Sequence, residues 1–347
     1  MNEKSKRTEL HELGEFRLID HITRNIKHRN SSTVIGVGDD AAVIDPQGKR
    51  MVITTDYMLE GIHFDLTYFP LKHLGYKAVV INLSDIYAMN ATPQQITVSI
   101  GLSKRFCLED VEEFYAGIYL ACERYGVDLV GGDTTSSLTG LTISVTAIGF
   151  ASNEDICYRS GAKENDLICV TGNLGAAYLG LQLLEREKRV FQSNPNVQPH
   201  FESHAYILER FLKPEAPREA IDLLRDANLI PTAMIDISDG LSSEMLHICK
   251  NSRVGCRIYT EKIPVDQETH RMAKEMNIDP LVAALSGGED YELLFTIPIG
   301  LHEKALSIKG ISIIGHITNS SKGVFLVAPD GNEIALTAQG WNAYKVE

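Results

Sequence analysis

The chain has 347 residues, 44% of them hydrophobic, and carries a formal net charge of −13 from 33 Lys and Arg residues against 46 Asp and Glu residues. A chain of this length exceeds what one hydrophobic core usually supports, so we expect two domains. The acidic balance argues against a nucleic-acid partner, because a protein that neutralises a phosphate backbone needs a basic surface.

The six cysteines are scattered, without a CxxC pair or the spacing of a Cys and His metal site. We expect them to be reduced thiols in the core, as is usual in the cytoplasm. The amino terminus lacks the apolar stretch of a signal peptide, and apolar runs such as residues 78–81 are too short to span a bilayer. The sequence therefore predicts a cytoplasmic protein that does not insert into a membrane.

The first half of the chain reads as a mixed α/β domain. Hydrophobic residues at helical spacing predict an amphipathic helix over residues 14–28. Runs rich in β-branched residues predict strands at 33–37, 41–44, 50–56, 94–102 and 141–150, and helices are predicted at 71–90 and 108–125. The polar, turn-rich segment 151–167 is interpreted as a linker, which gives predicted domains of 1–151 and 152–347.

The second half also alternates between strands and helices. Residues 167–187 have the form strand, glycine turn, helix, and a less regular polar stretch follows at about 189–205. Further helices are predicted at about 217–227 and 240–251, and strands at 233–238, 256–260, 292–299, 311–317 and 324–328. The second domain is therefore predicted to be α/β as well.

Aspartates recur in five segments: GVGDDAAV (36–43), ITTD (53–56), NLSD (82–85), GGDTTSS (131–137) and IDISDG (235–240). Clustered carboxylates repel one another unless cations offset their charge, and hard oxygen ligands of this kind favour Mg²⁺. Several Mg²⁺ ions in one site are typical of phosphoryl transfer. The hypothesis requires the fold to gather Asp40, Asp56, Asp85, Asp133, Asp236 and Asp239.

The positions of Asp56 in a predicted strand and of Asp85 in a predicted helix favour a functional role for these residues. Thr54 and Asp56 share one face near the expected strand end, with Thr55 on the other, although a lone TTD is more often a strand cap. Asp85 lies on a helical stripe with apolar neighbours, where an unpaired carboxylate is costly. Asn82, on the same stripe, is either part of the site or a hydrogen bonder between packed elements.

The other aspartate segments are each open to a structural explanation. Residues 131–137 read as a strand followed by a glycine-rich loop in which Asp133 could hold a cation, or as an ordinary turn. Asp236 interrupts an apolar run, which favours a functional role, whereas Asp239 before Gly240 could simply be a helix N-cap. The segment with Asp40 loosely fits a dinucleotide-binding pattern, but two adjacent carboxylates would repel a pyrophosphate, and a hairpin turn is the alternative.

Four further residues are candidates for ligand contacts. Arg159 suits a nucleotide phosphate, and Glu289 lies in a glycine-rich turn that is either a ligand loop or a hairpin. His63 by itself is more safely interpreted as a solvated or core residue, and spacing alone favours Trp341 as a core cap. The P-loop, protein-kinase, G-x-S-x-G and H-E-x-x-H motifs do not occur, so a phosphate site built from Mg²⁺ and aspartates remains.

Ten motifs in order, GEF, GVGDDAAV, ITTD, GIHF, YKAVVINLSDIYAM, GGDTT, RSGAK, VTGNLG, IDISDGL and SGGEDYELLFT, resemble the thiamine-monophosphate kinase family of the aminoimidazole ribonucleotide synthetase-like superfamily. The resemblance covers residues 14–295, with little family pattern between 190 and 217. It implies a two-domain fold, a homodimer whose amino-terminal sheets join into a barrel, and Mg²⁺-dependent in-line transfer of the ATP γ-phosphate to thiamine monophosphate, giving thiamine diphosphate and ADP.

The resemblance also implies roles for individual residues. Its Mg²⁺ ligands would be Asp40, Thr54, Thr55, Asp56, Asp85, Asp133, Asp236 and Asp239. ATP would contact Gly132, Asp133, Arg159 and Ser238, and the thiamine moiety His63, Glu289 and Trp341, the last at the family's terminal aromatic position. No general base is expected. The alternatives are another ATP-dependent synthetase of the superfamily or a non-catalytic Mg-nucleotide binding module.

Overall fold

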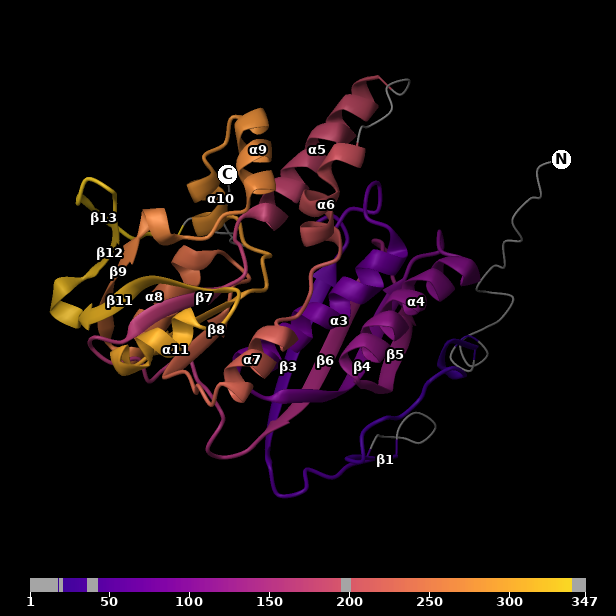
Figure 1. Cartoon of the computed structure of the whole chain (residues 1–347). Coiled ribbons are helices and arrows are strands. Elements are labelled where there is room, and N and C mark those ends of the chain that lie inside the picture. The colour runs from indigo at the N-terminus through magenta and orange to yellow at the C-terminus, as the bar shows by residue number, and fades with distance from the viewer. Residues whose placement is uncertain (1–17, 19–20, 36–42, 195–200, 339–347) are drawn as a thin grey trace. The chain divides into compact units, whose positions relative to one another are not determined.

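A computed structural model describes residues 18, 21–35, 43–194 and 201–338. The chain divides into two compact units, one of Met1–Ile86 with Ala91–Asn153 and the other of Tyr87–Asn90 with Glu154–Glu347. Each unit has its own sheet and helices (Figure 1). The mixed α/β fold predicted from the sequence is therefore confirmed, while the barrel across a dimer stays a prediction.

The first unit is built on a four-stranded sheet in the order β3-β6-β4-β5. Neighbours pair antiparallel except β4 and β5, which are parallel because helix α4 connects them. The elements are β3 (Arg50–Leu59), α3 (Leu71–Ala88), β4 (Thr92–Leu102), α4 (Leu108–Tyr125), β5 (Asp128–Ser136) and β6 (Thr142–Ala151). Two short strands, β1 (Thr33–Ile35) and β2 (Val43–Ile44), pair separately.

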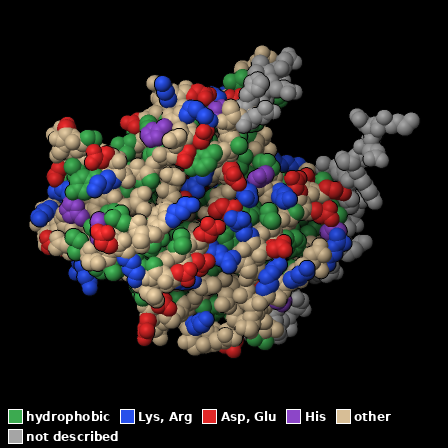
Figure 2. Space-filling view, viewed as in Figure 1, with side chains coloured by type: hydrophobic (Ala, Val, Ile, Leu, Met, Phe, Trp, Pro, Cys, Tyr) green, Lys and Arg blue, Asp and Glu red, His purple; other side chains and the backbone are tan. Residues whose placement is uncertain are grey.

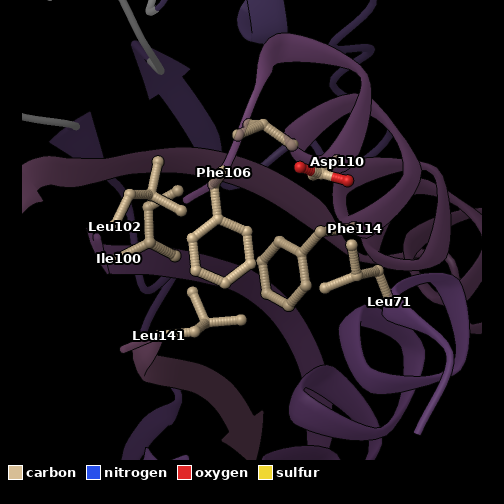
Figure 3. Close-up of a pocket in the computed structure, with 8 residues that line it drawn as sticks. Leu71, Ile100, Leu102, Phe106, Asp110, Phe114 and Leu141 are labelled. Atoms are coloured by element: carbon tan, nitrogen blue, oxygen red, sulfur yellow. The ribbon is translucent and has the colours of Figure 1, made fainter. Parts of the chain in front are cut away.

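Helices α3 and α4 pack on one face of this sheet. Figure 3 shows Phe106 and Phe114 side by side, with Leu71 of α3 on one side and Ile100 of β4 on the other, around a small apolar cavity. Every residue of α3 from Leu74 to Ser84 is buried. The opposite face is open in the single chain and exposes alternate residues of β3.

The two helices touch backbone to backbone through glycines. A Cβ atom at Gly75 would lie 2.0 Å from Phe114 O, and one at Gly117 would lie 1.9 Å from Lys72 O. No side chain fits at such distances, so α3 and α4 approach more closely than helices normally do. This contact fixes the position of the helix that carries Asp85.

The second unit contains a seven-stranded sheet in the order β13-β12-β9-β11-β7-β10-β8, in which only β12 and β9 are parallel neighbours. Its strands are β7 (Leu167–Thr171), β8 (Ala233–Asp236), β9 (Val254–Tyr259), β10 (Leu293–Ile297), β11 (Ile311–Asn319), β12 (Val324–Val327) and β13 (Glu333–Ala335). Its helices are α5 (Ala176–Ser193), α6 (Ala205–Leu212), α7 (Arg218–Asp226), α8 (Leu241–Ser252), α9 (Gln267–Met276), α10 (Pro280–Ser286) and α11 (His302–Leu306). Every residue of β7, β8 and β10 is buried, which places the core at this end of the sheet.

Most predicted elements are present, with two corrections in the first unit. The GGDTTSS segment is not a loop, because β5 continues to Ser136 and pairs with β4 throughout. Strand β3 runs on to Leu59, so Asp56 lies within the strand and not near its end. Thr has a high strand propensity, and pairing with a neighbouring strand outweighs the glycine signal. The opening helix falls largely outside the described residues, although Leu18 and Ile22 are buried.

Two general expectations can be compared with the structure. All six cysteines are buried free thiols. In the part of the chain that the structure describes, no helix has both the length and the apolar character needed to cross a membrane. On the face shown in Figure 2, acidic and basic side chains are interspersed, and hydrophobic side chains lie between them.

Candidate functional site

The first unit brings Asp56 and Asp85 together between β3 and α3. Thr54 Oγ1 donates to Asp85 Oδ2 across 2.6 Å, and the Asp56 amide donates to Asn82 Oδ1 across 3.0 Å. Asn82 is fully buried and also donates to Ala78 O. It therefore acts as the hydrogen bonder between packed elements, and it fixes the backbone at Asp56.

The electrostatics of this pair suit a cation. Burial, and to a lesser extent the charge of Asp85, raise the pKa of Asp56 to about 6. Ionising both carboxylates is therefore unfavourable unless positive charge lies beside them. Carboxylate and hydroxyl oxygens are hard donors that Mg²⁺ prefers, so the donor set fits this ion.

Thr55 directs its side chain away from Asp56, as the strand alternation predicts. Its hydroxyl donates to Val145 O across 3.1 Å and accepts from Thr146 Oγ1 across 3.1 Å. The Thr55 hydroxyl therefore belongs to the open face of the sheet, whereas Thr54 joins the carboxylate pair.

Asp133 does not join the carboxylate pair within one chain. It lies in β5, at the opposite edge of the sheet from β3, and three strand spacings of roughly 4.8 Å separate the two strands by about 14 Å. The cross-strand pairing puts Asp133 in one row with Tyr57, whose side chain is exposed on the open face. Adjacent residues of a strand face opposite sides, so Asp133 and Asp56 lie on opposite faces. Asp133 Oδ1 instead accepts from the Thr134 amide across 2.9 Å.

Gly132 pairs with Val98 of β4 and has a φ angle of +158°, a conformation that would direct a Cβ atom into the adjacent strand. A Cβ atom at this position would lie 1.9 Å from Val98 O. The neighbouring Gly131 has no such restriction, because its nearest heavy atom would be Thr97 Cγ2 at 3.7 Å. The first glycine of the GGD motif is therefore replaceable on steric grounds, and the second is not.

The second unit gathers a second acidic group where β8 leads into α8. Asp236 is buried at the end of β8, and the N-cap of α8 is Gly240, so the N-cap alternative for Asp239 is wrong. The Asp239 amide donates to Glu244 Oε1 across 3.0 Å. Burial raises the pKa of Glu244 to about 8, with Asp239 and Asp236 adding repulsion.

The sequence reasoning missed Glu244. Its side chain is buried, and among the described residues its Oε2 atom has no hydrogen-bond partner. The only local signal was an acidic residue in the first helical turn, which is common for reasons of helix electrostatics alone. Its burial depends on the loops packed around α8, which a local pattern does not reveal.

Arg159, Ser238 and Glu289 also belong to this group. The pKa of Asp239 is raised mainly by burial; His247 and Arg159 oppose the shift and Glu289 adds to it, so these charges lie near one another. The Glu289 amide donates to Ser238 O across 2.6 Å.

The remaining predicted residues lie apart or outside the described part. His63 follows β3, and its Nδ1 atom accepts from the Leu59 amide across 3.0 Å, which leaves Nε2 to carry the proton of a neutral ring. Asp40 and Trp341 fall outside the described residues. Among the described residues, no three His, Cys, Asp or Glu side chains are already arranged as a metal site.

Comparison with known proteins identifies the family. The model for "AIR synthase related protein, N-terminal domain" matches residues 38–151. Thiamine-monophosphate kinase of Buchnera aphidicola subsp. Schizaphis graminum is 35% identical over 345 residues, which cover 96% of this chain and 99% of the relative. The Bacillus subtilis thiamine-monophosphate kinase is 33% identical over 343 residues, covering 96% and 100%. The chain belongs to the thiamine-monophosphate kinase family.

Solved structures agree with this membership. AaThiL complexed with AMPPCP and TMP has 31% sequence identity and a TM-score of 0.75, with 98% of this chain and 100% of that chain covered. The hydrogenase maturation protein HypE in complex with ATP shares the fold, at 18% identity and a TM-score of 0.73 over 92% and 94% of the two chains. The similarity to the thiamine-monophosphate kinase family thus extends over almost the whole chain.

Proposed function

We propose that this protein transfers the γ-phosphate of ATP to thiamine monophosphate, giving thiamine diphosphate and ADP. Full-length similarity to thiamine-monophosphate kinases, including one bound to AMPPCP and TMP, supports this function. The observation in this chain that carries it is the pair of Asp56 and Asp85, two adjacent carboxylates whose ionisation calls for a cation. Such a pair suits metal-assisted phosphoryl transfer.

We further propose that Mg²⁺ binds at the aspartates. When bound, it would offset the charge repulsion between the donor and acceptor phosphates. Thr54 and Asn82 hold the Asp85 side chain and the Asp56 backbone in fixed positions, so these two ligands need little rearrangement. The proposed ligands are those of the family resemblance: Asp40, Thr54, Thr55, Asp56, Asp85, Asp133, Asp236 and Asp239. Because Thr55 and Asp133 lie on the other face of the sheet from Asp56, they would bind a separate ion.

The substrates would be held by charge and by aromatic contact. Arg159, with an exposed guanidinium group near Asp239, is proposed to bind an ATP phosphate together with Gly132, Asp133 and Ser238. His63, Glu289 and Trp341 are proposed to contact the thiamine moiety, since a carboxylate and an aromatic ring both attract its cationic thiazolium. The acceptor phosphate has a second pKa of about 6 and is mostly ionised at neutral pH, so no protein base is required.

We also propose a cytoplasmic homodimer. The exposed apolar side chains of Met51, Ile53 and Tyr57 on β3 support a partner for the open face of the first unit. A second copy of this chain would cover that face and remove exposed strand edges. Reduced, buried cysteines support the cytoplasmic location.

An acceptor screen tests the function. The purified protein is incubated with ATP and MgCl₂ and with thiamine monophosphate, thiamine or an acceptor of a related synthetase, and the products are separated by chromatography. We expect thiamine diphosphate and ADP from thiamine monophosphate alone, and no product with excess EDTA. ATP binding without turnover would indicate a non-catalytic module, and robust phosphorylation of thiamine would overturn the proposed acceptor.

A Trp341→Ala variant tests the substrate contacts in the same assay. Loss of an aromatic contact to a desolvated cation should raise the KM for thiamine monophosphate about tenfold and leave the KM for ATP nearly unchanged. A variant that melts early with both KM values unchanged would show that Trp341 is a structural cap.

A further inference from the structure

The loop from Gly287 to Glu292, between α10 and β10, has an unusual backbone. Glu289 and Tyr291 have φ angles of +62° and +51°, in the left-handed region that side chains other than glycine seldom occupy. Tyr291 is also buried. Two such residues in one loop persist only where the surroundings hold them.

Backbone hydrogen bonds tie one side of this loop to the segment that carries the aspartates. The Glu289 amide donates to Ser238 O across 2.6 Å, and the Tyr291 amide donates to Ile237 O across 2.9 Å. In return, the Ile237 amide donates to Glu292 O across 2.7 Å. The conformation of the loop and that of the Asp236 to Asp239 segment are therefore coupled.

The carboxylates of Asp290, which is buried, and Glu292, which is half-buried, tie the other side of the loop to the end of β7 and the segment after it. The carboxylate of Asp290 accepts from the Gly175 amide, at 3.0 Å for Oδ1 and 2.9 Å for Oδ2. Glu292 Oε2 accepts from Thr171 Oγ1 across 2.6 Å. Two acidic side chains thus lie inside the unit on one short loop.

Arg210 of α6 carries the positive charge that faces Asp290 and Glu292. Its Nη2 atom lies 3.0 Å from Glu292 Oε1 and donates to Asp290 O across 3.2 Å. The same atom donates to Asn173 O across 3.1 Å, so one side chain joins α6, the segment after β7 and the strained loop. Only 19% of the Arg210 side chain is exposed, so solvent screens these interactions weakly.

We propose that Arg210 is a positioning residue for the phosphoryl acceptor: it holds the loop 287–292 in the left-handed conformation that presents Glu289 beside Asp239 and Arg159. Glu289 itself contacts the substrate, and Arg210 acts only through it. The inference rests on the proposed function, because it assigns Glu289 to the thiamine moiety. Arg210 lies between residues 190 and 217, where the sequence shows little family pattern.

A double-mutant cycle tests this role. Arg210→Lys keeps the charge, but the lysine side chain is shorter and its ammonium does not reach the position of Nη2, the atom that makes all three contacts. We expect Arg210→Lys and Glu289→Gln each to raise the KM for thiamine monophosphate about tenfold, with the KM for ATP within about twofold of the parent, and the double variant to match Glu289→Gln alone. Arg186→Lys is the matched control, because Arg186 is a half-buried arginine of the same unit that pairs with Glu187 and the exposed Glu275, and the variant should change neither constant.

Additive effects in the cycle, or equal changes in both KM values, would overturn the positioning role. If Arg210→Lys does not fold, Glu292→Gln removes the same ion pair with little change in size and is expected to give the same selective KM increase. A parental protein without turnover would refute the proposed function alone. In that case the role of Arg210 is tested by hydrogen exchange at the Glu289 and Tyr291 amides. The exchange rate should rise at least about tenfold in Arg210→Lys and stay unchanged in Arg186→Lys. Equal rates in Arg210→Lys and the parent would overturn the inference.

Discussion

Thr54 donates its hydroxyl hydrogen to Asp85 Oδ2 across 2.6 Å and so joins the strand that carries Asp56 to the helix that carries Asp85. The bond orients one carboxylate of the pair. The other, Asp56, has a pKa raised to about 6 by burial and by the charge of Asp85. The ionised pair therefore lowers the stability of the folded protein unless positive charge lies beside it.

Asp56→Asn should separate activity from stability. Removing one of two adjacent charges from a metal site should lower turnover by about 10³-fold or more at saturating Mg²⁺. The melting temperature in metal-free buffer should be equal or higher, because the repulsion with Asp85 is lost. Asp45→Asn, at an exposed turn in the same unit, is the control and should behave like the parent. Near-parental turnover of Asp56→Asn would refute the metal assignment.

Asp290 should make stability depend on pH. Burial raises the pKa of Asp290 to about 7, against the opposing effects of Arg210 and the Gly175 amide. The folded value lies above the unfolded value of 3.8, so this contribution to stability is fully present below about pH 4 and is lost as pH rises through 7. Asp290→Asn cannot ionise, and its melting temperature should fall less between pH 5 and 8.5 than that of the parent.

The control for this comparison is Asp279→Asn. Asp279 is an exposed helix N-cap whose side chain accepts from the Leu281 amide, a role that Asn also fills. Melting curves of the three proteins in metal-free buffer suffice. Parallel pH profiles for the parent and Asp290→Asn would contradict the assigned titration.

Gly132→Ala should unfold the edge of the first sheet, and Gly131→Ala should not. A Cβ atom at Gly132 would overlap Val98 O at 1.9 Å, which requires β5 to move away from β4. We expect a loss of about 3 kcal/mol or more in the free energy of unfolding for Gly132→Ala, measured by urea denaturation. At Gly131 the new methyl group would make an ordinary contact of 3.7 Å with Thr97. Equal stabilities of the two variants would show that a Cβ atom at Gly132 does not meet Val98 of the adjacent strand.

The open face of the first unit predicts the effect of a charge at Tyr57. Tyr57 is 57% exposed in the single chain, and a glutamate there would place a charge in the proposed dimer interface. Light scattering should report a dimer for the parent and a monomer for Tyr57→Glu at micromolar concentration. Ile299→Glu, at a position of similar exposure in the second unit, should remain a dimer. A monomeric parent would refute the proposed assembly.

Local patterns predicted the elements whose hydrophobic residues recur regularly. The helical spacing of hydrophobic residues was sufficient to predict α3, α4, α7 and α8, because these helices have strong apolar faces or are buried. Helix α9 was missed, although its cap is readable: Asp266 accepts from the Glu268 amide. Strand β5 was predicted to end too early because two glycines resemble a turn. Only Gly132 is required to be glycine, and that requirement comes from Val98 in the adjacent strand.

The candidate site could be predicted in composition but not in arrangement. The sequence identified Asp56 and Asp85, and their proximity follows from packing of α3 on β3. It did not predict that Asp133 lies across the sheet and on the other face, since that depends on strand order. The sequence also did not predict the roles of Arg210 and Glu244, for a related reason. A charged residue becomes buried through packing against residues distant in sequence, and the local hydrophobic pattern does not show these contacts.

The glycine contact between α3 and α4 bears on which ion the first unit selects. Gly75 and Gly117 bring the two helix backbones together, so α3 cannot shift without breaking that contact. Mg²⁺ requires oxygen ligands at about 2.0 to 2.1 Å in near-octahedral geometry, whereas Ca²⁺ takes longer bonds and more ligands in looser arrangements. If the proposed ion binds between Asp56 and Asp85, a helix α3 held in place by α4 would disfavour the larger ion. Discrimination between the two cations would then originate in helix packing some distance from the carboxylates.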